Sequence, residues 1–172
     1  MERVGKFYKV SFEQFAADYK NIYPGFSDAK LREIYDAIEL PKRSTVDSAG
    51  YDFHSTVATV LEKGDTVHIP TGIRCEIKPG WFLQMVPRSG MGFKHRVQLD
   101  NTVGIIDGDY FHTDNEGHIQ IKMTKDSKGM NAGELPIEVG ARVCQGIFLP
   151  YGITEDDNTT STREGGFGST GV

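Results

Sequence analysis

The chain has 172 residues and a mass of 19.1 kDa, the size of one domain that can form a core without disulfide or metal cross-links. Its net charge of −5, from 19 Lys and Arg against 24 Asp and Glu, argues against a bulk electrostatic grip on nucleic acid. No apolar run is long enough for a membrane span or a secretory signal, and the two cysteines, Cys75 and Cys144, form no disulfide or metal pattern. We therefore expect a cytoplasmic protein with both cysteines in its core.

The first forty residues predict a short strand followed by two helices. The strand is expected over residues 4–10. Ser11 can cap the first helix, Gln14 completes a capping box, and apolar residues follow at helical spacing. A second helix begins at Ser27, and Pro41 ends its pattern. We expect both helices to pack on a core, and the alternative is a role in docking another protein.

From residue 46 onward the apolar residues alternate, which is typical of β-strands. The expected strands are short and are separated by turn residues such as those at 63–65 and 78–80. They lie at residues 66–69, 73–77, 81–86, 96–99, 119–123, 135–139 and 142–149. Many short strands at this spacing predict an antiparallel sandwich or jelly roll. Neither the βαβ alternation nor the phosphate loop of a parallel nucleotide-binding sheet is present.

After residue 153 the periodicity stops. Only Phe167 and Val172 are large and apolar beyond this point, too few to offset the entropy of ordering the segment. We therefore predict a mainly β domain over residues 1–153, a helical insertion at about 11–39 and a flexible C-terminal arm over 154–172.

The arm has a composition that could bind a nucleotide. Four glycines fall in the last eight residues, and glycine lets backbone N–H groups approach a phosphate closely. Arg163 can fork onto phosphate oxygens, Phe167 can stack on a base, and Ser169 and Thr170 add hydroxyl donors. Composition alone favours a flexible tail over such a clamp.

Two further segments combine glycine with polar side chains. Residues 87–92, PRSGMG, follow an expected strand and fit either a phosphate cradle or a polar turn. Residues 101–110 contain Asp107 and Asp109, either of which could act as a general base on water, while the Asn101 amide could read a base edge. A plain hairpin is the alternative here, because Asp-Gly is a strong turn dipeptide.

Three other segments carry weaker signals. Residues 49–53 place a carboxylate beside a glycine, and residues 142–145 place an arginine and an amide in a strand, where a buried structural arginine is the usual case. The stretch from His112 to His118 also holds two carboxylates, so metal binding is one interpretation. We favour a solvated loop, because zinc sites use tighter spacings of His and Cys.

Taken in order, five of these segments resemble the five motifs of the homotrimeric dUTPases (deoxyuridine triphosphate nucleotidohydrolases), a family with phage and Firmicutes members. The motifs are AGYD (Ala49–Asp52), PRSG (Pro87–Gly90), GIIDGDY (Gly104–Tyr110), GARVCQ (Gly140–Gln145) and GGFGSTG (Gly165–Gly171). The likeness covers about residues 41–172, and the ordered set is highly specific.

The chain departs from the family pattern in four places. Ala141 stands where motif four usually has an acid, and one residue is missing between Arg163 and Gly166. Residues 111–116 look like an insertion before Gly117, and the two N-terminal helices lie outside the likeness.

The resemblance implies hydrolysis of dUTP to dUMP and pyrophosphate with Mg²⁺ bound by the triphosphate, which limits uracil incorporation into DNA and supplies dUMP for dTMP synthesis. It implies that Asp107 deprotonates the water that attacks the α-phosphorus. The residues implied to meet uracil and the sugar are Asn101, Gly104, Ile105, Ile106, Tyr110 and Gln120. Those implied to meet the phosphates are Arg88, Ser89, Gly90 and Gln145, with Asp52 and Gln145 holding waters around the metal. The arm is implied to contribute Arg163, Phe167, Gly168, Ser169 and Thr170.

The resemblance also implies a homotrimer whose sites are shared between chains, with no nucleic-acid or membrane partner. The dCTP deaminases are the first alternative, but they have a glutamate where this chain has Lys122 and a glycine where it has Asp109. The second is a non-catalytic module that presents the helical insertion and loop 111–118 to a protein partner. Retention of Asp107 and Tyr110 favours catalysis.

Overall fold

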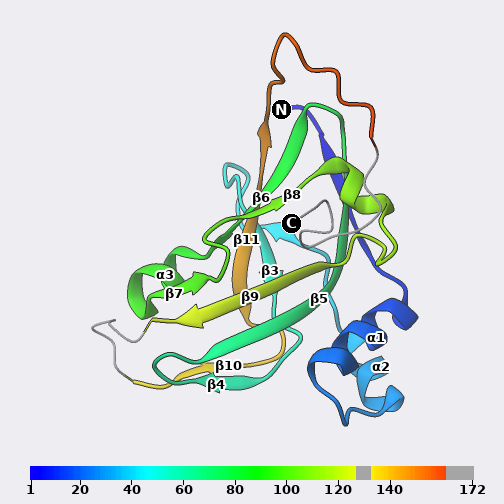
Figure 1. Ribbon diagram of the computed structural model, residues 1–172. Helices are drawn as coiled ribbons and strands as arrows, with labels where there is room; N and C mark the ends of the chain where they lie inside the picture. Colours follow the sequence, from blue (N-terminus) through cyan, green and yellow to red (C-terminus); the bar gives the residue numbers. More distant parts are fainter. Residues whose placement is uncertain (127–132, 162–172) are drawn as a thin grey trace.

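Two antiparallel β-sheets form the body of the fold, and a pair of helices lies beside them (Figure 1). The structure is a computed structural model that describes residues 1–126 and 133–161. One sheet consists, in spatial order, of β1 (Gly5–Lys9), β5 (Thr66–Ile77), β9 (Ile119–Lys125) and β7 (Val97–Leu99). The other consists of β2 (Lys42–Arg43), β3 (Tyr51–His54), β11 (Arg142–Pro150), β6 (Trp81–Pro87) and β8 (Gly104–Ile106). Two short strands, β10 (Leu135–Ile137) and β4 (Thr59–Leu61), pair with each other.

The helical segments are few and short. They are α1 (Phe12–Ile22), α2 (Asp28–Asp36), α3 (Ser89–His95) and the 3-10 helix η1 (Gly108–His112). The expectation of a mainly β, jelly-roll-like antiparallel fold with two N-terminal helices is confirmed. Among the residues that the structure describes, no helix is long and apolar enough to cross a membrane.

The core forms because strand residues alternate between its interior and its surface. In β9, Ile119, Ile121 and Met123 are buried and the residues between them are less so. Phe53 of β3 and Leu83 of β6 belong to the same buried cluster and come from the second sheet. Each such side chain stabilises the fold by roughly 1.5–3 kcal/mol when fully buried. Both cysteines are buried, as expected.

The two N-terminal helices attach to the sheets through one apolar face each. Phe15 and Tyr19 of α1 and Leu31 of α2 are almost fully buried. Figure 1 shows the helix pair beside β5, with the chain entering it from β1. The interpretation of these helices as amphipathic and packed on the core is therefore confirmed.

The helix caps agree with the sequence only in part. Ser11 and Ser27 cap α1 and α2, each accepting a backbone N–H three residues on. The reciprocal half of the predicted capping box is wrong, because the Gln14 amide donates to Asp18 at 2.9 Å instead. The Ser11 N–H, which Gln14 was expected to engage, donates to Glu116 at 2.7 Å. Glu116, more than a hundred residues away in the sequence, therefore accepts from the Ser11 N–H in place of the Gln14 side chain.

Three local predictions are corrected by tertiary packing. Residues 66–77 form one strand rather than two, with a bulge between Pro70 and Ile73 opposite β9. The alternative of a plain polar turn after β6 is wrong, because helix α3 begins there. The Asp-Gly pair at 107–108 starts η1 and does not form a hairpin turn.

The segment from Phe111 to His118 is not a solvated loop, as the sequence had led us to expect. Thr113, Gly117 and His118 are buried, and Glu116 is partly buried. Gly117 has a φ of +66°, and a Cβ placed on it would lie 2.6 Å from the Tyr110 carbonyl oxygen. This close approach to η1 requires glycine.

Gly117→Ala should therefore destabilise the protein far more than an alanine at another left-handed glycine. Gly64 has a φ of +87° and open space where its Cβ would be, so it supplies the matched control. In urea unfolding we expect a loss of about 3 kcal/mol or more for Gly117→Ala and about 1 kcal/mol for Gly64→Ala. Equal losses would show that contact with η1 contributes nothing.

Candidate functional site

A cavity of about 430 Å³ lies between β8 and the first half of β9. We call it the β8–β9 cavity. Six predicted site residues line it, namely Asn101, Gly104, Ile105, Ile106, Tyr110 and Gln120. Its other walls are His68, Met85, Leu99, Asp100, Ile119, Ile121 and Lys122. The structure thus brings together every residue that the resemblance implied for the base and the sugar.

The β8 wall of this cavity is the edge of a sheet. In the described part of the chain β8 pairs only with β6, so the backbone N–H and C=O groups on its outer edge are not used in a ladder. A Cβ on Gly104 would lie 2.9 Å from the Met85 Cβ, so glycine lets β8 lie close against β6. A planar ligand with alternating donors and acceptors can bind such an edge as another strand would.

Tyr110 forms a fixed wall of the same cavity. Its side chain is buried, and its hydroxyl donates to the His118 carbonyl oxygen at 2.9 Å. The same hydroxyl accepts from the Asn115 amide at 2.9 Å. Because the hydroxyl is already satisfied by the protein, the ring is the part that a ligand can meet.

A second cavity, of about 410 Å³, opens beside β3 and β11. We call it the β3–β11 cavity. Four predicted site residues line it: Asp52, Arg88, Ser89 and Gln145. The remaining lining comes from Ser44, Ser48, Ala49, Gly50 and Ile147. Motifs one, two and four therefore meet in one place.

Asp52 joins two arginines in this cavity. One carboxylate oxygen accepts from Arg88 Nε at 2.9 Å, and the other lies 3.3 Å from Arg142 Nη1 and 2.8 Å from Ser44 Oγ. The Arg142 side chain is 49% exposed, so the expectation of a buried arginine is wrong. One buried carboxylate between two half-exposed guanidiniums leaves local positive charge for an anion.

Gln145 lies next to this ion cluster. In the sheet it stands opposite Asp52 on one side and Val86 on the other. A Cβ on Gly50 would lie only 2.2 Å from Gln145 Oε1, so the amide rests directly on the backbone of motif one. The glycine beside Asp52 is thus explained by the close approach of Gln145.

The two cavities share no lining residue in the part of the chain that the structure describes. Asp107 stands at the N-cap position of η1, partly buried, and lines neither cavity. Gly90 lies exposed in the first turn of α3. The predicted arm residues Arg163, Phe167, Gly168, Ser169 and Thr170 lie outside the described residues.

The oxygen ligands in the β3–β11 cavity suit a cation that is already coordinated by water and by the substrate phosphates. Both Asp52 oxygens already accept from protein groups, and no cluster of three or more His, Cys, Asp or Glu side chains gathers in the described residues. Mg²⁺ commonly keeps several waters and binds through one or two carboxylates and the substrate phosphates. Asp52 and Gln145 therefore fit contact with Mg²⁺ through water.

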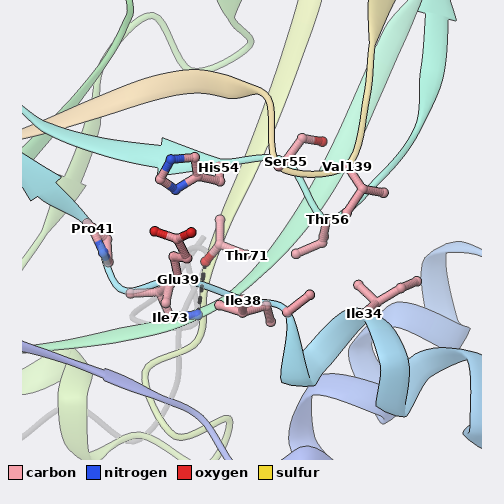
Figure 2. Close-up of a pocket in the computed structure, with 12 residues that line it drawn as sticks. Ile34, Ile38, Glu39, Pro41, His54, Ser55, Thr56, Thr71, Ile73 and Val139 are labelled. Carbon is pink, nitrogen blue, oxygen red and sulfur yellow. Dashed lines mark hydrogen bonds between the residues drawn. The ribbon is translucent and has the colours of Figure 1, made fainter.

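A third cavity, of about 200 Å³, lies where α2 meets the sheets and contains none of the predicted site residues (Figure 2). Ile34 of α2 and Ile38, just after that helix, supply part of its apolar wall. The Thr71 hydroxyl already donates to the Ile119 carbonyl oxygen at 2.6 Å. Among the described residues His54 Nδ1 has no hydrogen-bond partner. This cavity is a gap in the packing between helix and sheet, away from the residues that carry the chemistry.

Sequence reasoning missed a buried Asp–His pair beside the β8–β9 cavity. His118 is fully buried, and its Nδ1 lies 2.5 Å from Asp18 Oδ2 on α1. Burial by itself raises the pKa of Asp18, but hydrogen bonds from His118, Gln14 and Gln120 lower it overall.

A second carboxylate binds the same helix. Burial raises the pKa of Glu116, but hydrogen bonds from the Ser11 hydroxyl and N–H and the charge of Arg74 lower it overall. The sequence held one indication of these contacts. The two segments that depart from the family pattern, the N-terminal helices and residues 111–116, occur together in this chain.

Comparison with known proteins gives a consistent result. Residues 36–171 match the dUTPase family. The deoxyuridine 5'-triphosphate nucleotidohydrolase of Lactococcus lactis is 40% identical over 138 residues, which cover 78% of this chain and 89% of that protein. The protein of the same name from Escherichia coli is 37% identical over 140 residues, covering 77% and 87%.

Solved structures agree with this. The dUTPase of Streptococcus mutans is 32% identical, with a TM-score of 0.61 over 87% of this chain and 98% of that one. The dUTPase of phage phi11 of S. aureus, described with a species-specific insert, has a TM-score of 0.61 over 92% of this chain and 97% of that one. At 19% identity the phage protein supports the fold alone.

The two depressed carboxyl pKa values predict that the fold loses stability in acid. Because folding lowers the pKa of Asp18 and Glu116 below their ordinary values of 3.8 and 4.5, their contribution is fully present above about pH 5 and is lost as the pH falls through the folded values. Urea unfolding between pH 6 and pH 3 should show a steeper loss for the wild type than for Asp18→Asn. Parallel curves would contradict this assignment.

Proposed function

The chain belongs to the dUTPase family and hydrolyses dUTP to dUMP and pyrophosphate, and we propose that its two motif-lined cavities bind the two ends of this substrate. The observation that carries the proposal is that the two cavities are lined by chemically different groups. The β8–β9 cavity offers a strand edge, an amide and an aromatic wall, whereas the β3–β11 cavity offers two guanidiniums and a hydroxyl. A deoxynucleoside suits the first and a triphosphate suits the second.

Uracil recognition rests on the edge of β8. Uracil presents one N–H between two carbonyl oxygens, which complements alternating backbone donors and acceptors at Gly104 and Ile105 and the amide of Asn101. Cytosine reverses the pattern at two of these three groups, so it would leave protein groups unpaired. Ile106 and the backbone at Gln120 complete the wall, and a narrow pocket excludes the thymine methyl group.

Tyr110 selects the sugar. Its hydroxyl is held by His118 and Asn115, so the ring cannot turn away from the cavity without breaking two hydrogen bonds. A deoxyribose packs against the ring face, and a 2′-hydroxyl would lie against carbon with no partner. This accounts for a preference for deoxynucleotides.

The triphosphate binds at motif two. Arg88 and Ser89 line the β3–β11 cavity, and Gly90 follows them in the first turn of α3. Asp52 holds the Arg88 guanidinium in place at 2.9 Å, which orients a flexible side chain before substrate arrives. The overall charge of −5 does not prevent this, because nearby arginines set the local field.

Hydrolysis proceeds by attack of water on the α-phosphorus. Asp107 accepts a proton from the water, a new P–O bond forms, and the bond between the α-phosphorus and its bridging oxygen breaks to release pyrophosphate. Mg²⁺ bound to the triphosphate would neutralise its charge and favour the leaving group. Asp52 and Gln145 would hold that ion through water, and the family likeness assigns Arg163 of the arm to the phosphates and Phe167 to the base.

The complete site requires more than one chain. The nucleoside residues and the phosphate residues lie in separate cavities of a single chain, which supports a homotrimer in which one chain supplies the β8–β9 cavity and another the β3–β11 cavity. The arm of a third chain would close the site. In the cell this activity limits uracil in DNA and supplies dUMP.

Deamination of dCTP is the competing reaction. The position where the deaminases have a glutamate base is Lys122, which lines the β8–β9 cavity and pairs with Asp100 at 3.5 Å. An ammonium group is not a base for activating water at neutral pH. This residue favours dUTP hydrolysis.

Substrate selectivity tests the assignment of the two cavities. With Mg²⁺ present, pyrophosphate release from dUTP should exceed release from dCTP, dTTP or UTP by roughly 10⁴ in kcat/KM, because each competitor leaves a polar group unpaired or clashes. Turnover of any of the three at a rate near that of dUTP would contradict the proposed binding mode.

Mixed assemblies test the sharing of sites. Asp107→Asn alone should lose roughly 10²–10⁴ in kcat, and Arg88→Ala should lose about 10² in kcat/KM. When both chains are unfolded together in equal amounts and refolded, a working site needs Asp107 from one chain and Arg88 from another. Random assembly gives ½ × ½, so about a quarter of sites should recover. Activity no higher than the mean of the two parents, in a trimer confirmed by light scattering, would contradict the sharing.

A further inference from the structure

The helix pair α1–α2 lies largely before the part of the chain that matches the dUTPase family, which begins at residue 36. It nevertheless contacts the segment that supplies the sugar wall. Asp18 of α1 lies 2.5 Å from His118, the residue just before β9. His118 is fully buried, so this is an interior contact and not a surface ion pair.

The hydrogen bonds of His118 define its tautomer. Its Nε2 lies 2.8 Å from the backbone N–H of Gly72, which can only donate. Nε2 is therefore the acceptor, and Nδ1 carries the proton that is donated to Asp18. The imidazole thus joins β5 to α1 with both ring nitrogens satisfied.

Asp18 engages the cavity wall at a second point. Its carboxylate accepts from the Gln14 amide at 2.9 Å and interacts with the amide of Gln120, which lines the β8–β9 cavity. The Gln120 oxygen in turn lies 2.7 Å from His68 Nε2. The Asp18 carboxylate on α1 therefore binds His118 directly and lies beside Gln120, two residues further along the chain.

His118 transmits this restraint to Tyr110. The Tyr110 hydroxyl donates to the His118 carbonyl oxygen at 2.9 Å. Any movement of His118 therefore moves the anchor of the ring that forms the sugar wall. Asp18 is thus connected to Tyr110 through one residue, His118, which is hydrogen-bonded to both.

Other contacts fix the position of the helices relative to His118 and Tyr110. The Ser11 hydroxyl lies 2.5 Å from Glu116, which also pairs with Arg74 at 3.7 Å, and Arg74 donates to the Phe111 carbonyl oxygen. On the far side, the bulge in β5 at Gly72 packs against Ile38, which follows the end of α2 and which Figure 2 shows beside Thr71 and Ile73.

We infer that the helix pair serves the active site and that Asp18 is a positioning residue, which holds the sugar wall in place through His118. This rests on the proposed role of Tyr110 in sugar selection. The consequence is that a substitution on a helix outside the family region changes how well the enzyme distinguishes dUTP from UTP.

Asp18→Ala tests the inference, with Asp28→Ala as the matched control. Asp28 lies on α2 and pairs with Lys20 at the surface, so its loss perturbs the same helix pair without affecting the contact with His118. For Asp18→Ala we expect KM for dUTP to rise about fivefold, kcat to change less than about twofold, and the dUTP/UTP ratio of kcat/KM to fall about tenfold. Asp28→Ala should match the wild type in all three.

Two milder variants keep the test decisive if Asp18→Ala does not fold. Asp18→Asn retains an oxygen for the His118 N–H and should recover most of the lost discrimination. Glu116→Gln weakens the Ser11 contact and should lower the dUTP/UTP ratio by about twofold to threefold. An unchanged ratio in Asp18→Ala overturns the inference, and so does an unchanged ratio in Glu116→Gln if the alanine variant is unfolded.

The wild-type enzyme separates this failure from failure of the proposed function. If the wild type itself turns over UTP as fast as dUTP, the role given to Tyr110 is wrong and the inference falls with it. If the wild type discriminates and Asp18→Ala discriminates equally well, the role of Tyr110 stands and only the positioning role of Asp18 is rejected.

Discussion

The bulge in β5 is the constraint on which the arrangement around the nucleoside cavity depends. Between Pro70 and Ile73 two residues of β5 have no counterpart on β9, and Gly72 there adopts a φ of +71°. The bulge directs the Gly72 N–H toward His118 and makes room for Ile38 on the other side. Without it, β5 would continue its ladder past Ile119, and neither the imidazole nor the helix pair could sit where they do.

The ion pairs of the β3–β11 cavity join residues that are distant in the sequence. Asp52 lies between Arg88 and Arg142, and each comes from a different strand or loop of one sheet. Burying the carboxylate while leaving the guanidiniums half-exposed costs little, because the anion is fully hydrogen-bonded and the cations remain hydrated. An acidic protein can thereby present a cationic cavity to an anionic substrate.

Much of the candidate site was predictable because its residues occur in short ordered motifs. The six residues assigned to the nucleoside line one cavity, and four of those assigned to the phosphates and metal waters line another. The strands were also predictable where alternation was regular, as in residues 119–123. The misses share a cause, since α3, η1 and the buried segment 111–118 are short, and their conformations are set by packing and not by local propensity.

By itself the sequence determined the alternating strands, the two capped helices and the order of the five motifs, because periodicity and motif spacing are local properties of the chain. Only the tertiary structure decided that the motif residues separate into two cavities and that Asp18 meets His118, a hundred residues away. It also decided that the Ser11 N–H donates to Glu116 and not to the Gln14 side chain. The physical reason is that a buried donor takes whichever acceptor the packing brings to it, and that choice depends on bulges, strand order and turns that no local pattern records.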